Sequence, residues 1–216
     1  MTIQYHGPTG NVNDPSAQAA VAQLAAMRAA RTPPIALYTD GGVIGQNPSP
    51  IGGTWAWCMV SADGTRTRHA YGYVTPADLD TPTVSNNHTE LLALVLGLEA
   101  LPAGWAGTVY SDSWVSLQRV FLAAKLANVP PWLVDRLQTL QKSGALKQMT
   151  YTLLDGHPTR AELAAGIGKR GHGVSIHNVW CDQQCSAIAR ERPRRSSRPK
   201  RVRCAAALPS HGMMAM

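Results

Sequence analysis

Hydrophobic positions along the chain follow two periods, which predict strands and helices in a defined order. Short apolar or alternating runs predict strands, and apolar residues spaced three and four apart predict helices. The predicted strands are 35–40, 54–60, 65–74, 108–111 and 148–154. The predicted helices are 86–101, 113–124, 131–142 and 177–190, with a shorter helical turn at 160–165. The helix at 86–101 has a predicted inner face of apolar residues at positions 91, 94, 95, 98 and 101.

The order of these elements predicts an α/β fold. Three consecutive strands without a helix predict an antiparallel meander, and later strands that alternate with helices predict right-handed crossovers. We therefore expect a five-stranded mixed sheet, in which parallel strands follow the meander and helices cover both faces. Open sheets of this kind bind ligands at the carboxyl ends of their parallel strands, where Asp40 and Asp112 are predicted to lie.

Positive charge is concentrated at one end of the chain. Residues 190–203 carry eight basic residues and one acid, a net charge of 8 − 1 = +7, which equals the charge of the whole 216-residue chain. We predict a partly helical N-terminal arm at 1–34, a folded domain at 35–190 and a disordered basic tail at 191–216. The tail favours nucleic acid as a partner, and a solubilising tail without a specific partner is the alternative.

Two features predict a cytoplasmic protein without a membrane-spanning segment. The sequence has no apolar run of about 18 residues, and its start lacks the basic-then-apolar order of a secretory signal. Reduced cysteines are therefore expected, with Cys58 as a small core residue. His177, Cys181 and Cys185 recur every four residues on the last helix, which suits a packed helix face or a zinc site. We favour the helix face.

Four acidic residues stand out in a chain with 13 acidic and 20 basic residues. They fall at strand ends or on amphipathic helices, and they are Asp40, Glu90, Asp112 and Asp182. A carboxylate beside apolar neighbours is costly to desolvate unless it is paired or binds a cation. Each one alone suits a helix cap, a surface charge or a salt bridge. The four together suit two hard divalent cations.

The segments TDGG, NPSPIGG, NNHTELLAL, SDS and NVWCDQQCSAIAR follow one another between about residues 35 and 190. In this order they resemble the type 1 ribonuclease H family. The resemblance implies the ribonuclease H-like fold and an Asp-Glu-Asp-Asp set of metal ligands, matched here by Asp40, Glu90, Asp112 and Asp182. It also implies two Mg²⁺ ions, with Mn²⁺ as an alternative, and hydrolysis of the RNA strand of RNA–DNA hybrids. We expect a monomer in which Asp40 is shared by both ions.

The resemblance also implies contacts with the substrate. Asn47, Asn86 and Asn87 match positions that meet the minor groove and its 2′-hydroxyl groups, which distinguish RNA from DNA. Ser113 and Asn178 match further family positions. The two asparagines at 86 and 87 lie at the predicted start of the helix that carries Glu90, and Asn87, Ser113 and Asn178 each also suit a helix N-cap.

A histidine after the last strand assists proton transfer in this family, and two candidates match it. His157 directly follows the strand, whereas His172 has the family's spacing from Asp182. We favour His157, because a strand end fixes position better than a long loop, and His172 stays the alternative. Asp155 and His177 are lesser candidates in the same region.

Some features depart from the family pattern and leave other functions open. Gly42 and Trp114 stand where Ser and Gln are common, and no basic protrusion follows residue 125. The basic residues Arg160, Lys169 and Arg170 and the tail are candidates to grip the hybrid instead. The competing hypotheses are a hybrid-binding module without strong cleavage and another nuclease of the same fold, such as an exonuclease. We favour the endoribonuclease, because a pure binding module has no use for four clustered acids.

Overall fold

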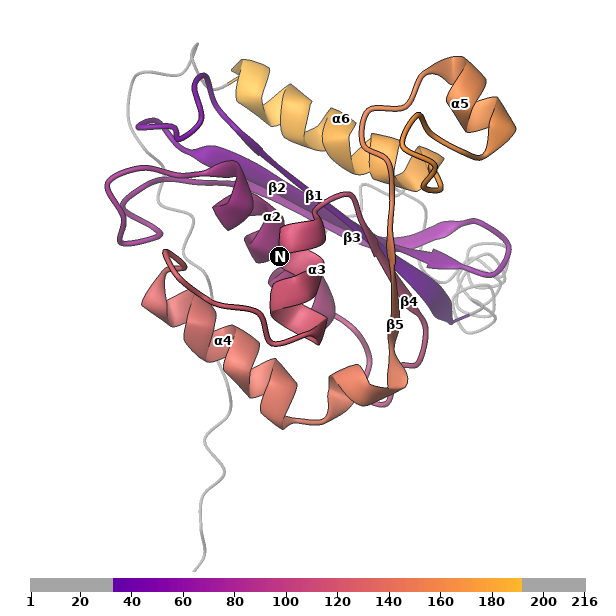
Figure 1. The fold of residues 1–216 in the computed structure, drawn as a ribbon, viewed down its shortest axis with the longest axis horizontal. Helices are drawn as coiled ribbons and strands as arrows, with labels where there is room; N and C mark the ends of the chain where they lie inside the picture. Colours follow the sequence, from indigo (N-terminus) through magenta and orange to yellow (C-terminus); the bar gives the residue numbers. More distant parts are fainter. Residues whose placement is uncertain (1–32, 192–216) are drawn as a thin grey trace, which may run out of the picture.

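Five strands form one mixed sheet in the order β3-β2-β1-β4-β5 (Figure 1). The computed structural model describes residues 33–191, so nearly all of the partly helical arm predicted at 1–34 and the basic residues from 192 onward lie outside the described residues. The strands are β1 (Pro34–Val43), β2 (Gly53–Ser61), β3 (Arg66–Val74), β4 (Thr108–Ser111) and β5 (Thr150–Leu153). β1, β2 and β3 pair antiparallel, and β4 and β5 extend the sheet in parallel from β1. The predicted mixed sheet is confirmed.

β1 is longer than predicted, which changes the place of Asp40. The glycine-rich residues after Asp40 were expected to form a loop, but Gly41, Gly42 and Val43 continue the antiparallel ladder with β2. Asp40 therefore lies inside β1 and not at its end. The parallel pairing of β1 with β4 stops at Thr39, so Asp40 is the first residue beyond it. Its side chain still lies at the sheet edge where parallel strands place ligands.

Every helix predicted between residues 33 and 191 is present. The helices are α2 (Asn86–Glu99), α3 (Trp114–Phe121), α4 (Pro131–Lys142), α5 (Arg160–Ala165) and α6 (Ile176–Glu191), with a 3₁₀ helix η1 (Ala145–Gln148) before β5. α3 ends three residues earlier than predicted, because Ala123 has a φ of 49° and cannot continue a right-handed helix. None of the described helices combines the length and apolar character that crossing a membrane requires.

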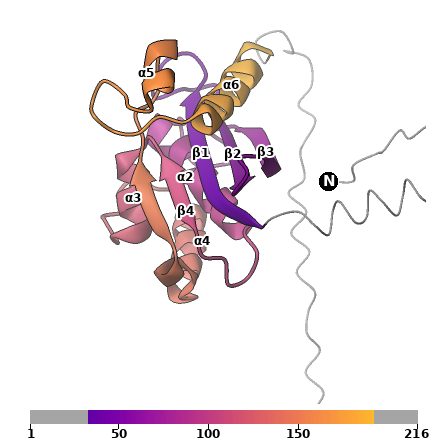
Figure 2. The same cartoon turned by 90° about the vertical axis from the view of Figure 1, so that its right-hand side faces the viewer.

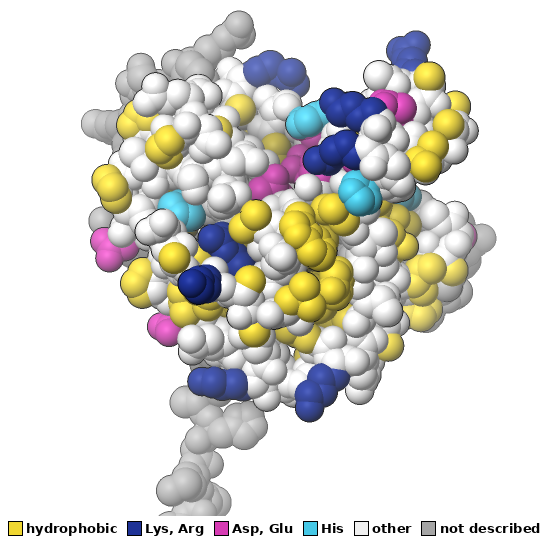
Figure 3. Space-filling model, viewed as in Figure 1, with side chains coloured by type: hydrophobic (Ala, Val, Ile, Leu, Met, Phe, Trp, Pro, Cys, Tyr) yellow, Lys and Arg dark blue, Asp and Glu magenta, His cyan; other side chains and the backbone are white. Residues whose placement is uncertain are grey.

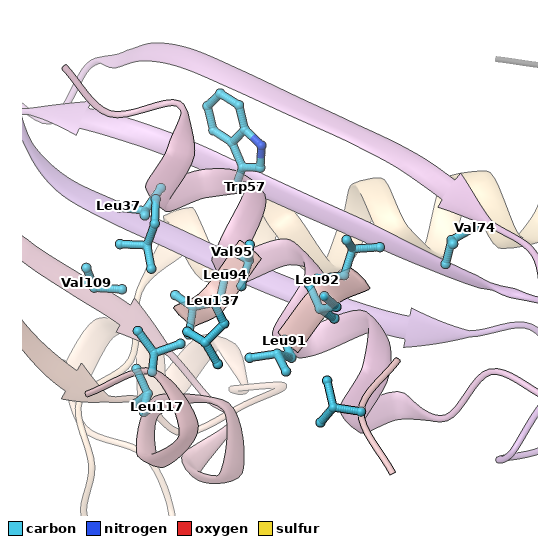
Figure 4. Packing of buried hydrophobic residues seen from close by; sticks show 14 of the residues in the cluster. Leu37, Trp57, Val74, Leu91, Leu92, Leu94, Val95, Val109, Leu117 and Leu137 are labelled. Carbon is cyan, nitrogen blue, oxygen red and sulfur yellow. The ribbon is translucent and has the colours of Figure 1, made fainter. Parts of the chain in front are cut away.

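The main core lies between the sheet and the helices α2, α3 and α4 (Figures 1 and 4). The predicted inner face of α2 is buried at Leu91, Leu94, Val95 and Leu98. Leu92 is buried as well, because α2 is covered by the sheet on one side and by α3 and α4 on the other. This central position holds the first turns of α2 firmly against β1.

The opposite face of the sheet is covered by α6 (Figure 2). Cys181 and Cys185 of α6 pack there against Cys58 and the small side chains Ala36 and Ala56. The Sγ atoms of Cys58 and Cys181 lie 3.9 Å apart, and all three thiols are free. These contacts confirm Cys58 as a core residue and agree with the interpretation of 181 and 185 as a packed helix face.

The helix caps differ in part from the prediction. α2 is capped by Ser85, whose Oγ accepts from His88 N while Ser85 N donates to His88 Nδ1. Asn86 and Asn87 are therefore the first two residues of α2, in agreement with the predicted start at 86, but Asn87 is not the N-cap. Ser85 and Asn87 have similar preferences for the cap, so propensity alone could not separate them.

The other two predicted caps have opposite outcomes. Ser113 caps α3, since its Oγ accepts from Ser116 N. Asn178 lies inside α6 and does not cap it, while the Ser175 Oγ before the helix accepts from His177 N.

Candidate active site

Three carboxylates from separate elements meet in an open cleft. Asp40 comes from β1, Glu90 from α2, and Asp112 directly follows β4. One oxygen of each lies within 4.8 Å of the others, and we call these three residues the carboxylate cluster. The cleft has a volume of about 730 Å³. Figure 3 shows acidic side chains (magenta) in this hollow, bordered by basic side chains (dark blue) and histidines (cyan).

The backbone at Gly41 explains how two of these carboxylates come together. A Cβ atom at Gly41 would overlap the backbone of Thr89 and Glu90, so only a glycine lets α2 approach β1 this closely. Gly41 N also donates to Asp40 Oδ1 over 2.8 Å. The close approach therefore places the buried Asp40 and Glu90 side by side, with Asp112 next to them.

Burial and mutual repulsion disfavour three negative charges in the carboxylate cluster. Burial raises the pKa of Asp40 well above its ordinary value, and the charges of Asp112 and Asp182 add to this effect. Burial likewise raises the pKa of Glu90, followed by the charges of Asp40 and Asp112. Burial also raises the pKa of Asp112, although the charges of His157 and Arg170 act in the opposite direction. Such an arrangement is stabilised by a cation.

The donor set of the carboxylate cluster fits a hard divalent cation. Glu90 Oε2 and Asp112 Oδ1 are buried, and neither accepts a hydrogen bond from a described residue. Buried polar atoms without a partner are rare, and here both are carboxylate oxygens. Oxygen ligands of this kind suit Mg²⁺ or Mn²⁺.

Asp182 lies on the wall of the same cleft but outside the carboxylate cluster. It is carried by α6, and its Oδ2 atom lies 3.6 Å from Nδ1 of His157. A smaller cavity of about 220 Å³ adjoins the two residues and is also lined by Asp112 and Asn178. Asn178 Oδ1 is buried there without a partner among the described residues.

The two candidate histidines differ in position. His157 lines the cleft, and its side chain is 78% exposed. His172 is not among the cleft-lining residues; its carbonyl oxygen accepts from Gly168 N. His177, a lesser candidate, is in the first turn of α6, where its ring packs on that of Tyr38 with a centroid distance of 5.1 Å.

The candidate substrate contacts do not all reach the cleft. Asn86, Asn87 and Ser113 line it, and Asn86 Nδ2 donates to Glu90 Oε1 over 3.4 Å. Asn47 does not line the cleft, but its Oδ1 accepts from Asn86 N and braces the start of α2. Trp114 also lines the cleft and is 43% exposed. No sequence signal pointed to a contact role for this tryptophan.

The segment after β5 forms one wall of the cleft. Lys169 and Arg170 line the cleft, whereas Arg160 does not. The carboxylate of Asp155, a lesser candidate from the sequence, accepts hydrogen bonds from the backbone and side chain of Arg170. It lies outside the cleft and fixes the segment. Gly156 follows it, and a Cβ there would overlap Asp112 Oδ2.

Comparison with known proteins finds two relatives of this chain that are named ribonuclease H. No protein-family model matches it. A ribonuclease H of Chlorobium phaeovibrioides is 27% identical over 163 residues, which cover 74% of this chain and 97% of that protein. A ribonuclease H of Rhodopirellula baltica is 38% identical over 80 residues, which cover 37% of this chain and 44% of that protein. The chain is therefore similar to proteins named ribonuclease H, in one case over nearly the whole length of the relative.

Solved structures agree with the ribonuclease H fold. The N-terminal RNase H domain of a Mycobacterium tuberculosis protein matches with a TM-score of 0.50 and 16% identity, covering 76% of this chain and 99% of that domain. The RNase H1 called LC11, isolated from compost, also matches with a TM-score of 0.50 and 16% identity, covering 72% and 95% of the two chains. At this identity the match shows that the fold is that of ribonuclease H.

Replacing Glu90 with Gln should stabilise the metal-free ribonuclease H domain at neutral pH. The pKa of Glu90 is raised in the folded state, so the protonated carboxyl group stabilises the fold. This contribution to the free energy of unfolding is fully present at a pH below the ordinary pKa of 4.5, and it is lost as the pH rises through the raised pKa. Gln stays neutral, so the melting temperature of the variant should exceed that of the wild type by a few degrees at pH 7 and match it near pH 4. Mg²⁺ should raise the melting temperature of the wild type more than that of the variant. A variant that melts below the wild type in EDTA at pH 7 would contradict this electrostatic account.

Proposed function

We propose that this chain is a metal-dependent endonuclease that hydrolyses the RNA strand of RNA–DNA hybrids. The observation that carries the proposal is the carboxylate cluster, with oxygens within 4.8 Å of one another in an open cleft of a ribonuclease H fold. The two curated relatives in Chlorobium and Rhodopirellula are named ribonuclease H. A carboxylate cluster without a cation would repel a nucleic-acid phosphate, which disfavours a pure binding module.

The proposed cofactor is Mg²⁺, in two ions, with Mn²⁺ as the alternative. Asp40 would serve both ions, Glu90 and Asp112 would hold one, and Asp182 would complete the other. Bound ions would activate the attacking water and stabilise the leaving 3′-oxygen. The buried oxygens of Glu90 and Asp112 without a partner support this assignment.

We assign the proton-transfer role to His157. Its ring is exposed to the cleft, and its Nδ1 atom lies 3.6 Å from the Asp182 carboxylate, which can orient the imidazole. An exposed ring can exchange a proton with water at Nε2 while Nδ1 faces Asp182. The position of His172 outside the cleft supports choosing His157.

Polar side chains beside the carboxylate cluster would read the RNA strand. The amide groups of Asn86 and Asn87 offer both donors and acceptors to a 2′-hydroxyl, and Ser113, which lines the same cleft, offers a hydroxyl. Asn47 would act through Asn86, whose backbone it holds. Asn178, which lines the smaller cavity, would contact the substrate there. We further propose that the domain at 35–190 works as a cytoplasmic monomer.

Deleting residues 192–216 should weaken binding of a hybrid and flatten its dependence on salt. The deletion removes seven basic residues between 192 and 203, and the chain continues into them from α6, whose Ala189 lines the cleft. Each ionic interaction with a phosphate that the deletion abolishes should reduce the slope of log K against log salt by about one. Fluorescence anisotropy at several salt concentrations measures both quantities. A variant with the seven basic residues replaced by Ser separates charge from length, and an unchanged Kd and slope in both variants would reject the prediction.

A panel of labelled substrates tests the proposed function against its alternatives. Wild-type protein in Mg²⁺ should cut the RNA strand of a hybrid internally and leave duplex DNA, single-stranded RNA and single-stranded DNA intact. Shortening of a strand from one end would indicate an exonuclease of the same fold. Tight binding of the hybrid without cutting in Mg²⁺ or Mn²⁺ would indicate a binding module.

A further inference from the structure

The segment from Asp155 to Gly173 is held in a defined shape on the wall of the cleft, and we call it the β5–α6 wall. Gly173 pairs with Leu154 and with Ile167 through single β-bridges, and Asp155 N donates to Gly173 O over 2.9 Å. α5 inside it is closed by a capping box between Thr159 and Glu162. The wall is therefore an ordered structure rather than an open loop.

An ion pair between Arg170 and the buried carboxylate of Asp155 fixes the cationic part of this wall. The Asp155 side chain is 2% exposed, and its two oxygens accept from Arg170 N and Arg170 Nε, each over 2.7 Å. Burial opposes the charge of Asp155, but the hydrogen bonds and the charge of Arg170 outweigh it, so the pKa of this carboxyl is lowered. A Cβ at Gly168 would overlap the Asp155 carboxylate, so the wall is also packed tightly around it.

The pair leaves most of the Arg170 guanidinium available. Its side chain is 55% exposed and lines the cleft, and no described residue accepts a hydrogen bond from its two terminal NH₂ groups. Its charge reaches the carboxylate cluster, where it acts to lower the pKa of Asp112. Lys169 lines the cleft beside it and forms no ion pair with a described carboxylate.

We propose that Arg170, oriented by Asp155, binds a backbone phosphate of the nucleic acid next to the carboxylate cluster, and that Lys169 adds a second phosphate contact. The inference rests on the proposed function, since it needs a nucleic acid in the cleft. A guanidinium whose Nε is held by a carboxylate presents its remaining donors in a fixed plane, which matches the oxygens of a phosphodiester. Asp155 is then a positioning residue, and Arg170 and Lys169 are binding residues.

Anisotropy with an RNA–DNA hybrid in Mg²⁺ tests this assignment, in an Asp40→Asn background that prevents cutting. Arg170→Ala should raise Kd about tenfold and lower the salt slope by about one, the effect of removing one cation from a phosphate. Arg170→Lys should have a Kd between those of the Arg170 protein and Arg170→Ala, because an ammonium group keeps the charge but lacks the planar, bidentate donors of a guanidinium group. Lys169→Ala should also lower the slope. Lys147→Ala, an exposed cation of η1 outside the cleft, is the matched control and should change neither quantity.

The role of Asp155 has a separate readout. Asp155→Asn should raise Kd several-fold when Arg170 is retained. In a protein that already carries Arg170→Ala it should have little further effect on Kd, since the two residues act as a unit. A purely structural role would lower the melting temperature of Asp155→Asn and Arg170→Ala while leaving the salt slope at that of the control. That result, or a Kd for Arg170→Ala equal to that of Lys147→Ala, overturns the inference. Cleavage by the wild type is measured in parallel, so a failure of the proposed function itself would be recognised by absent cutting and absent binding.

Discussion

Replacing Asp40 with Asn should lower the rate of hybrid cleavage by about 10³-fold or more, the scale of losing a group that acts on the reacting atoms. Asp40 lies at the centre of the site, where its carboxylate faces Glu90 and Asp112 and also interacts with Asp182. Asn has the same shape but no negative charge, so the fold should persist while the cation affinity falls. Single-turnover cleavage of a labelled hybrid measures the loss.

The matched control for this variant is Asp135→Asn on the exposed face of α4, which makes the same chemical change away from the cleft. It should cleave at the wild-type rate. Raising the Mg²⁺ concentration should not restore Asp40→Asn, because the substitution would weaken the ligand that we propose for both ions. Equal rates for the two variants would show that the carboxylate cluster is not the catalytic centre.

Replacing Gly41 with Ala should damage both stability and activity, although the change adds one methyl group. The new Cβ would overlap the backbone of Thr89 and Glu90, and the backbone atoms of a packed helix cannot rotate away as a side chain can. We expect a loss of about 1–3 kcal/mol in the free energy of unfolding, the usual range for overpacking. Because α2 must shift, the Glu90 carboxylate should leave the carboxylate cluster and cleavage should fall by at least about tenfold, as displaced catalytic groups do.

Gly42→Ala is the control on the next residue of the same strand. Its Cβ would lie 3.2 Å from Thr54 Oγ1, which belongs to a side chain and can yield by a few tenths of an ångström. This variant should unfold and cleave much like the wild type. Denaturant unfolding and cleavage assays on the two variants compare them directly, and a Gly41→Ala protein with normal stability would refute the close-approach argument.

Local sequence patterns predicted most helices and strands, because the residues that determine each element lie within it or next to it. The runs at 108–111, 131–142 and 160–165 coincide with β4, α4 and α5, whose apolar spacing, proline start or capping residues are all local. The extension of β1 through Gly41 and Gly42 was missed because glycines favour loops, and pairing there depends on the partner strand β2. The cap of α2 was missed because Ser85 and Asn87 are both good capping residues.

The candidate site divides in the same way. The four acids and His157 were named because strand ends and motif order point to them, and the fold brings all five to one cleft. The pairing of Asp155 with Arg170 spans 15 residues of irregular chain, which no periodicity encodes. The sequence shows an acid after an apolar strand and a basic loop further on, but no sequence pattern indicates that the two side chains form a pair. The need for glycine at 41 and 156 could not be predicted either, because the atoms that exclude a Cβ there belong to other elements of the fold.

The central claim is that the carboxylate cluster forms a metal-dependent site for cutting the RNA strand of a hybrid. The most direct test is a hybrid labelled separately on its RNA and DNA strands, incubated with wild-type protein in Mg²⁺, in EDTA, and with Asp112→Asn in Mg²⁺. We predict internal cuts in the RNA strand by the wild type in Mg²⁺, none in EDTA, and none above background with the variant. Cutting that persists in EDTA or in the variant, or an intact RNA strand with folded wild-type protein in both Mg²⁺ and Mn²⁺, would contradict the claim.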